Sequence, residues 1–72
     1  MIKIYKTNIE NARKKNRIAD ILNNITGPKF WNIDLEDSDK ILRVDATKQK
    51  VKQVESLLKM AGFYYEELPY QL

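Results

Sequence analysis

Side chains that usually carry chemistry in small proteins are scarce in this sequence. Its 72 residues include no cysteine and no histidine. Thiolate and imidazole are the usual ligands of zinc and copper(I), and they supply the commonest nucleophile and proton carrier near neutral pH. Met1 and Met60 hold the only sulfur atoms, and we expect Met60 to pack or to lie at the surface. The composition therefore argues against most small-protein metal sites and catalytic mechanisms.

The acidic residues do not form a recognisable site either. Glu36, Asp37 and Asp39 lie close together, and carboxylates can bind calcium or magnesium. Their run lacks the glycine and the distal glutamate of a calcium-binding loop, so we expect a solvated turn. The sequence also shows no nucleophile paired with a base and no glycine-rich phosphate loop. We therefore expect a protein that is not an enzyme and needs no cofactor.

The most distinctive cluster of side chains is basic. Residues 1–29 carry seven Lys or Arg against two acids, whereas residues 30–72 carry six against eight, for a net charge of +3. The excess is concentrated in what we call the basic segment, formed by Arg13, Lys14, Lys15 and Arg17. At a helix start, such cations together with free backbone N–H groups suit a phosphate or an acidic protein surface.

Two simpler interpretations of the basic segment are also open. Cations in the first turn of a helix are unfavourable by about 0.3–1 kcal/mol each. The helix could therefore begin late, with Asn16 as its N-cap and the cations in a mobile loop. Alternatively, the helix begins near Asn11 and the cations form an ordinary solvated face. The sequence alone is compatible with both helix starts.

Alternation of apolar and polar residues predicts the strands. Ile2 and Ile4 alternate with Lys3 and Tyr5, which predicts a strand that buries the isoleucines. Further strands are predicted at 31–35, with Ile33 in the apolar phase, and at 41–45, with Leu42 and Val44 in the apolar phase. The turn at 36–39 joins them as a hairpin. Trp31 shares the phase of the buried residues of its strand. A short edge strand at 63–65 is an optional addition.

Apolar residues at helical spacing predict two helices. Ile18, Ile21, Leu22 and Ile25 form the stripe of the first helix, which Gly27-Pro28 ends. The second helix is expected to begin after the N-cap Thr47 and to end at Gly62. Its buried positions are expected to be Val51, Val54, Leu57, Leu58 and Ala61.

These elements predict an α+β fold in the order βαββα, with a final β strand as an option. One apolar face on each element is satisfied by a ferredoxin-like two-layer sandwich, with an antiparallel sheet and both helices on one face. We expect one domain over residues 1–68 and a short tail at 69–72. The apolar stretches are too short to span a membrane, and no signal-peptide pattern is present, so a cytoplasmic protein is expected.

The last residues bear on the oligomeric state. An aromatic, apolar group closes the sequence, formed by Tyr64, Tyr65, Pro69, Tyr70 and Leu72. We expect it to cover the sheet edge of its own chain, which leaves a monomer. The alternative is edge-to-edge pairing with a second copy.

Four stretches resemble the heavy-metal-associated domain of copper chaperones and metal-transporting ATPases. They are Lys6-Thr7-Asn8-Ile9, Trp31-Asn32-Ile33-Asp34-Leu35, Asp39-Lys40-Ile41-Leu42-Arg43-Val44 and Leu58-Lys59-Met60-Ala61-Gly62-Phe63. The resemblance extends over about residues 1–68. It implies that Asn11 and Lys14 occupy the positions of the two cysteines that bind metal in this family. It also places Ile9 where the family often has a buried methionine, and Phe63 where a residue overhangs the metal loop.

The resemblance therefore predicts the scaffold without its metal site. Asparagine is a poor ligand for a soft cation, and a charged lysine has no free lone pair. Because metal chaperones of this family commonly dock through basic residues near the same loop, we hypothesise a non-catalytic interaction or regulatory module. The basic segment would contact an acidic protein surface or another anionic partner, with Phe63 beside it.

The sequence is compatible with two alternative functions. One is a true metal-binding or metal-transport domain with an atypical site. The other is a weak nucleic-acid binder, in which Tyr5 and Phe30 would stack on bases from the open face of the sheet. Asp34 and Asp45 on that face would repel phosphates, which argues against this second alternative.

Overall fold

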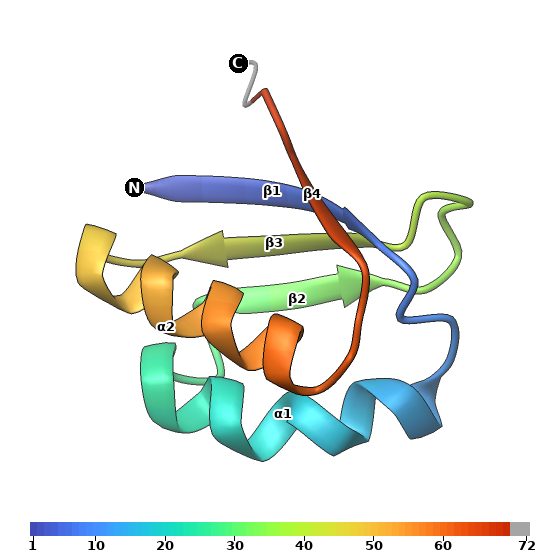
Figure 1. Ribbon diagram of the computed structural model, residues 1–72, viewed down its shortest axis with the longest axis horizontal. Coiled ribbons are helices and arrows are strands. Elements are labelled where there is room, and N and C mark those ends of the chain that lie inside the picture. Colours follow the sequence, from blue (N-terminus) through green and yellow to red (C-terminus); the bar gives the residue numbers. More distant parts are fainter. Residues whose placement is uncertain (70–72) are drawn as a thin grey trace.

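The computed structural model describes residues 1–69 as an α+β fold with a four-stranded antiparallel sheet and two helices (Figure 1). In chain order the elements are β1 (Ile2–Thr7), α1 (Ala12–Thr26), β2 (Trp31–Asp34), β3 (Ile41–Asp45), α2 (Lys48–Met60) and β4 (Tyr65–Leu68). The predicted class and order of elements are confirmed, and the optional last strand is present. Within this part of the chain, neither helix is long and apolar enough to cross a bilayer. Residues 70–72 of the predicted tail, with Tyr70 and Leu72, lie outside the described residues.

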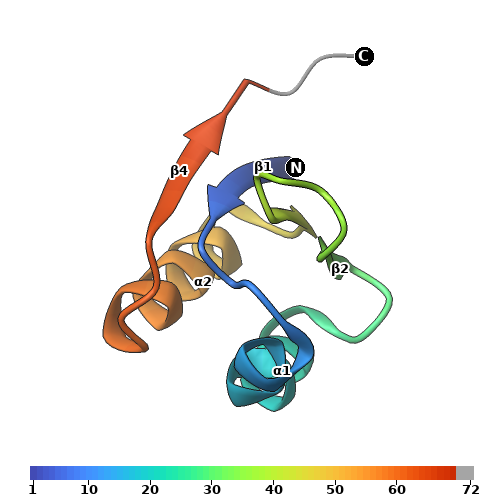
Figure 2. The ribbon, with the colours of Figure 1, turned by 90° about the vertical axis from the view of Figure 1, so that its right-hand side faces the viewer.

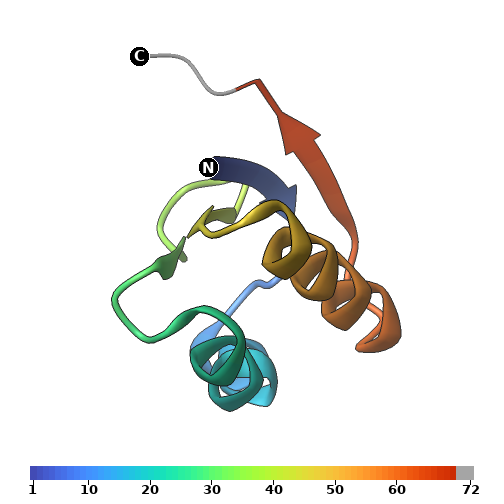
Figure 3. The same cartoon turned by 90° about the vertical axis from the view of Figure 1, so that its left-hand side faces the viewer.

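The strands lie in the order β2-β3-β1-β4, and each neighbouring pair is antiparallel. β2 and β3 form the predicted hairpin, with Ile33 opposite Leu42. β4 pairs with β1 and begins at Tyr65, two residues later than the first residue of the predicted edge strand. The backbone N–H and C=O groups of β1 are therefore paired on one side with β3 and on the other with β4. Figures 2 and 3 show α1 and α2 side by side, with α1 at the bottom of both views.

The prediction that β1 buries Ile2 and Ile4 is wrong, because the strand has the opposite phase. Tyr5 is fully buried and Thr7 nearly so, whereas both isoleucines are partly exposed. The Tyr5 hydroxyl donates a hydrogen bond of 2.6 Å to Glu55 Oε2 in α2. Burial, followed by this hydrogen bond and the nearby charge of Glu55, raises the pKa of Tyr5 well above its usual value.

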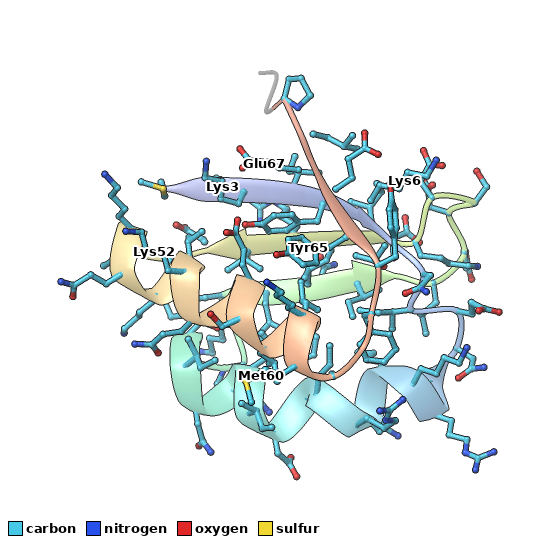
Figure 4. The ribbon with its side chains drawn as sticks, viewed as in Figure 1. Lys3, Lys6, Lys52, Met60, Tyr65 and Glu67 are labelled. Atoms are coloured by element: carbon cyan, nitrogen blue, oxygen red, sulfur yellow. The ribbon has the colours of Figure 1, made fainter. Side chains whose placement is uncertain are left out.

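The neighbouring strand and helix support this phase of β1. The rings of Tyr5 and Tyr65 meet edge to face, with centroids 5.9 Å apart. Lys3, on the same side of the strand, forms an ion pair of 2.8 Å with Glu67 of β4 (Figure 4). An isoleucine at the position of Tyr5 would lose the ring contact with Tyr65 and would leave Glu55 without its donor.

The core is one cluster between the strands and the helices. Its fully buried side chains outside β1 include Ile18 and Leu22 of α1, Leu42 and Val44 of β3, and Val54 and Leu58 of α2. The predicted buried residues of β3 and the central residues of both helical stripes are therefore confirmed. Ile21 is an exception, because its side chain is 47% exposed. Trp31 is partly buried against the core, and its indole N–H donates to Asn23 Oδ1 over 2.7 Å.

The helix ends follow local rules that the sequence already indicates. The Thr47 side chain caps α2 by accepting from the Lys50 backbone N–H, as predicted. At the other end, Gly62 has φ +82°, and the Phe63 N–H bonds to the Leu58 carbonyl while the Gly62 N–H bonds to the Lys59 carbonyl. These two bonds form a Schellman motif, which turns the chain so that Phe63 packs into the core.

Candidate functional site

Helix α1 begins at Ala12, with Asn11 as its N-cap. The Asn11 side chain accepts a hydrogen bond of 2.9 Å from the Lys14 backbone N–H, and its carbonyl accepts from the Lys15 N–H over 3.0 Å. The alternative in which the helix begins at Asn16 and the cations lie in a loop is therefore wrong. Arg13, Lys14 and Lys15 lie in the first helical turn or directly after it, and that turn holds no acidic residue.

Asn11 and Lys14 are the two positions at which the resemblance places metal-binding cysteines, and both already have other partners. The side-chain oxygen Oδ1 of Asn11 caps the helix. The Lys14 ammonium forms an ion pair with Glu10 over 3.0 Å. The structure thus joins these positions through a capping bond, and their side chains offer no pair of donors to a soft metal ion.

The other cations of the basic segment lie beside aromatic rings. The Lys15 Nζ is 5.6 Å from the centroid of the Trp31 ring. The Arg17 guanidinium carbon is 5.1 Å from the centroid of the Phe63 ring. Arg17 Nη2 also donates to the Ala61 carbonyl over 3.4 Å, where the C-terminal end of α2 favours a positive charge. These contacts orient two of the four cations and leave their charges at the surface.

Phe63 lies under Arg17 rather than beside an open surface. Its side chain is only 8% exposed and belongs to the core cluster. A partner that approaches here would therefore meet the Arg17 guanidinium before it met the ring. Arg13 is exposed at the start of the helix. The structure thus places the four cations near the N-terminal end of α1, where Lys15 and Arg17 contact rings from different elements and Phe63 supports Arg17.

Helix α2 is also strongly basic, which sequence reasoning missed. The sequence of α2 includes four lysines, all exposed, namely Lys48, Lys50, Lys52 and Lys59. Together the two helices contain eight Lys or Arg against Asp20 and Glu55, a formal charge of +6 in a chain of +3. The rest of the chain is therefore acidic, with a formal charge of −3. A division of the sequence into halves hides this contrast, because each half contains one helix.

A metal site finds little support in the side chains. Among residues 1–69, no group of three or more His, Cys, Asp or Glu side chains is arranged to hold a metal ion. Met60 is 87% exposed, as expected for a surface residue. In the predicted turn, Asp37 Oδ1 accepts from the Asp39 N–H over 2.7 Å, and Asp39 forms an ion pair with Lys6 over 3.6 Å. These carboxylates stabilise the hairpin turn.

The structure also bears on the two aromatic residues offered for base stacking. Tyr5 points into the core and is fully buried, so its predicted place on the open sheet face is wrong. Phe30 is 50% exposed and precedes β2. A stacking platform that rested on these two rings therefore loses one of them.

Comparisons with protein-family models, with curated proteins and with solved structures found no match to this chain. The geometry and charge of the two helices are consequently the observations from which a function has to be inferred.

Proposed function

We propose that the chain is a ferredoxin-like domain, with both helices on one face of the sheet, related in architecture to the heavy-metal-associated domain. The strand order β2-β3-β1-β4 and the two connections through helices support this assignment. Figures 2 and 3 support the common position of the helices. The full burial of Ile9 agrees with the buried residue that the resemblance places there. In this proposal the scaffold is kept and the metal ligands are replaced by a helix cap.

We further propose that the domain is a non-catalytic interaction or regulatory module, which binds an acidic protein surface through the basic segment. The observation that carries the proposal is the position of Arg13, Lys14 and Lys15 at the start of a capped helix. Each cation there costs about 0.3–1 kcal/mol of helix stability, so packing alone does not explain them. An anionic partner converts this local cost into a favourable interaction.

A titration with a negatively charged peptide that has no apolar side chains tests this function. A fluorescein-labelled peptide of glutamate and glycine is titrated with the wild type and with Arg13→Ala/Lys14→Ala/Lys15→Ala/Arg17→Ala. Loss of up to four charge pairs with the peptide is expected to weaken binding by about tenfold at low salt. The control is Lys3→Ala/Lys6→Ala/Lys29→Ala/Arg43→Ala, which removes the same charge from outside the helices and is expected to bind more tightly than the first variant. Equal affinities of the two variants would show that only net charge matters and would contradict the proposal.

A further inference from the structure

A shallow apolar groove of about 620 Å³ runs between the two helices. Its apolar lining consists of Ile18, Ile21, Ile25, Leu57, Met60 and Ala61. Residues of α1 between 17 and 25 line one side of the groove, and residues between 52 and 61, from α2 and its C-cap, line the other. Because Arg17 contacts Ala61, the start of α1 lies beside the end of α2, and the helices run in opposite directions.

Two large apolar side chains in this groove lie outside the buried core. Ile21 is 47% exposed and Met60 is 87% exposed, and they come from opposite sides of the groove. Figure 4 shows Met60 near the C-terminal end of α2 and Lys52 in its first half. The groove is therefore apolar along its length, with Arg17 near one end and Lys52 near the other. Exposed apolar residues gathered in a hollow with a charged rim are typical of a contact site for a partner.

The charge around the groove decides which occupant fits it. The charged side chains in its lining are Arg17 and Lys52, and both are positive. A second copy placed face to face across the groove would bring the positive ends of one groove against the positive ends of the other, so the contact would be repulsive. A partner with an apolar ridge and acidic flanks avoids this repulsion.

The dimensions of the groove favour a helix as that ridge. From Arg17 to Ile25 the helix α1 advances about 12 Å, which is slightly more than two turns. Apolar residues at i, i+3, i+4 and i+7 of a partner helix extend over a similar length. We propose that the interhelical groove binds an amphipathic helix of a partner protein, whose apolar stripe packs on Ile21 and Met60 and whose acidic residues pair with Arg17 and Lys52. This inference rests on the proposed function, since Arg17 belongs to both surfaces.

Three synthetic peptides of about 18 residues, long enough to form a helix, test the proposal. The first has a leucine stripe at i, i+3, i+4 and i+7 with glutamates elsewhere. The second replaces the glutamates with lysines, and the third scrambles the first so that no stripe forms. Affinities are measured by fluorescence anisotropy, and far-UV circular dichroism checks that each protein variant is folded. The first peptide is expected to bind at least about tenfold more tightly than either of the others.

Variants locate the peptide on the protein. Ile21→Gln/Met60→Gln is expected to weaken the first peptide by about tenfold or more, because both side chains lose apolar contact with it. Phe30→Gln changes a similarly exposed apolar residue outside the interhelical groove and is expected to leave the affinity unchanged. Since Ile21 and Met60 are already exposed, the double variant is expected to remain folded.

The possible results separate this inference from the proposed function. If the double variant binds like the wild type while the basic-segment variant binds weakly, the groove proposal is overturned and the proposed function stands. If neither variant is weakened, both are overturned. Sedimentation that shows a dimer, lost in Ile21→Gln/Met60→Gln, would assign the groove to a second copy and overturn the inference. Binding to phosphatidylserine vesicles in place of the first peptide would overturn it in favour of a lipid surface.

Discussion

The substitution Tyr5→Phe tests the least expected feature of the fold. It removes only the hydroxyl group, which donates over 2.6 Å to the Glu55 carboxylate. A hydrogen bond to a charged group contributes about 1.5–3 kcal/mol. Glu55 is partly exposed and can be rehydrated, so we expect the lower value, a loss of about 1.5 kcal/mol. For a domain of this size the melting temperature should fall by roughly 6–12 °C.

A double-mutant cycle with Glu55→Ala isolates the interaction between the two side chains. In the wild-type background, Glu55→Ala leaves the buried Tyr5 hydroxyl without its acceptor, which costs about 1–3 kcal/mol. In the Tyr5→Phe background this penalty is absent. Urea unfolding followed by circular dichroism should therefore give a coupling energy of at least about 1 kcal/mol. Strictly additive effects would refute the hydrogen bond.

The pH dependence supplies an independent measurement on the same residue. The pKa of Tyr5 is raised mainly by burial, so the folded protein keeps a proton that the unfolded chain loses above its ordinary pKa of 10.0. The stabilisation of the fold by the protonated Tyr5 hydroxyl is therefore fully present below pH 10, and above pH 10 it falls by about 1.4 kcal/mol per pH unit. The deficit of Tyr5→Phe relative to the wild type should therefore shrink between about pH 10 and pH 11. A constant deficit would mean that Tyr5 is accessible to solvent.

Three further substitutions test local features. Gly62→Ala should lower the free energy of unfolding by about 1–2 kcal/mol, because an alanine is strained at the φ of +82° that Gly62 adopts. The added methyl group itself meets no atom within 4 Å beyond the chain neighbours. An unchanged urea midpoint would contradict this backbone conformation. Asn11→Asp should keep the cap and stabilise α1 by about 0.3–1 kcal/mol through the helix dipole, a gain that 1 M salt should reduce; destabilisation in thermal unfolding would contradict the cap. Asn11→Cys/Lys14→Cys should create a copper(I) site at the helix start. Copper(I) should then raise the melting temperature of the double variant and not that of Asn11→Cys alone. An equal rise in both variants would argue against the placement of the family's cysteines at these positions.

The elements with strong local signals were predictable from the sequence. Thr47 and Gly62 mark the ends of α2, and both act as expected in the structure. Alternation around Ile33 and Leu42 correctly gave the hairpin and its buried face. Each of these features depends on residues that are near one another in the chain or on a simple period of two.

The phase of β1 could not be read in the same way. The alternation of Ile2 and Ile4 with Lys3 and Tyr5 favours burial of the isoleucines by hydrophobicity. The opposite phase is stabilised by contacts with residues about fifty or more positions away, Tyr5 with Glu55 and Lys3 with Glu67. Such long-range polar partners have no local signature in the sequence.

The candidate site was also only partly predictable. The cluster at 13–17 was visible as a run of charges, and its supporting contacts with Trp31 and Phe63 were not. Ile21 matched the helical stripe and was expected in the core, but it lies on the side of α1 that faces the interhelical groove. The groove and the joint positive charge of the helices arise only when α1 and α2 pack together.

Locating the anion-binding surface by NMR tests the proposed function at the level of single residues. Backbone ¹H–¹⁵N spectra of the wild type are recorded during titration with the glutamate–glycine peptide. Binding at the basic segment should give saturable shifts concentrated on the amides of residues 11–17, which weaken as salt is added. Shifts confined to the sheet or to the turn at 36–39, with the amides of α1 unmoved, would contradict the claim that the basic segment is the binding surface.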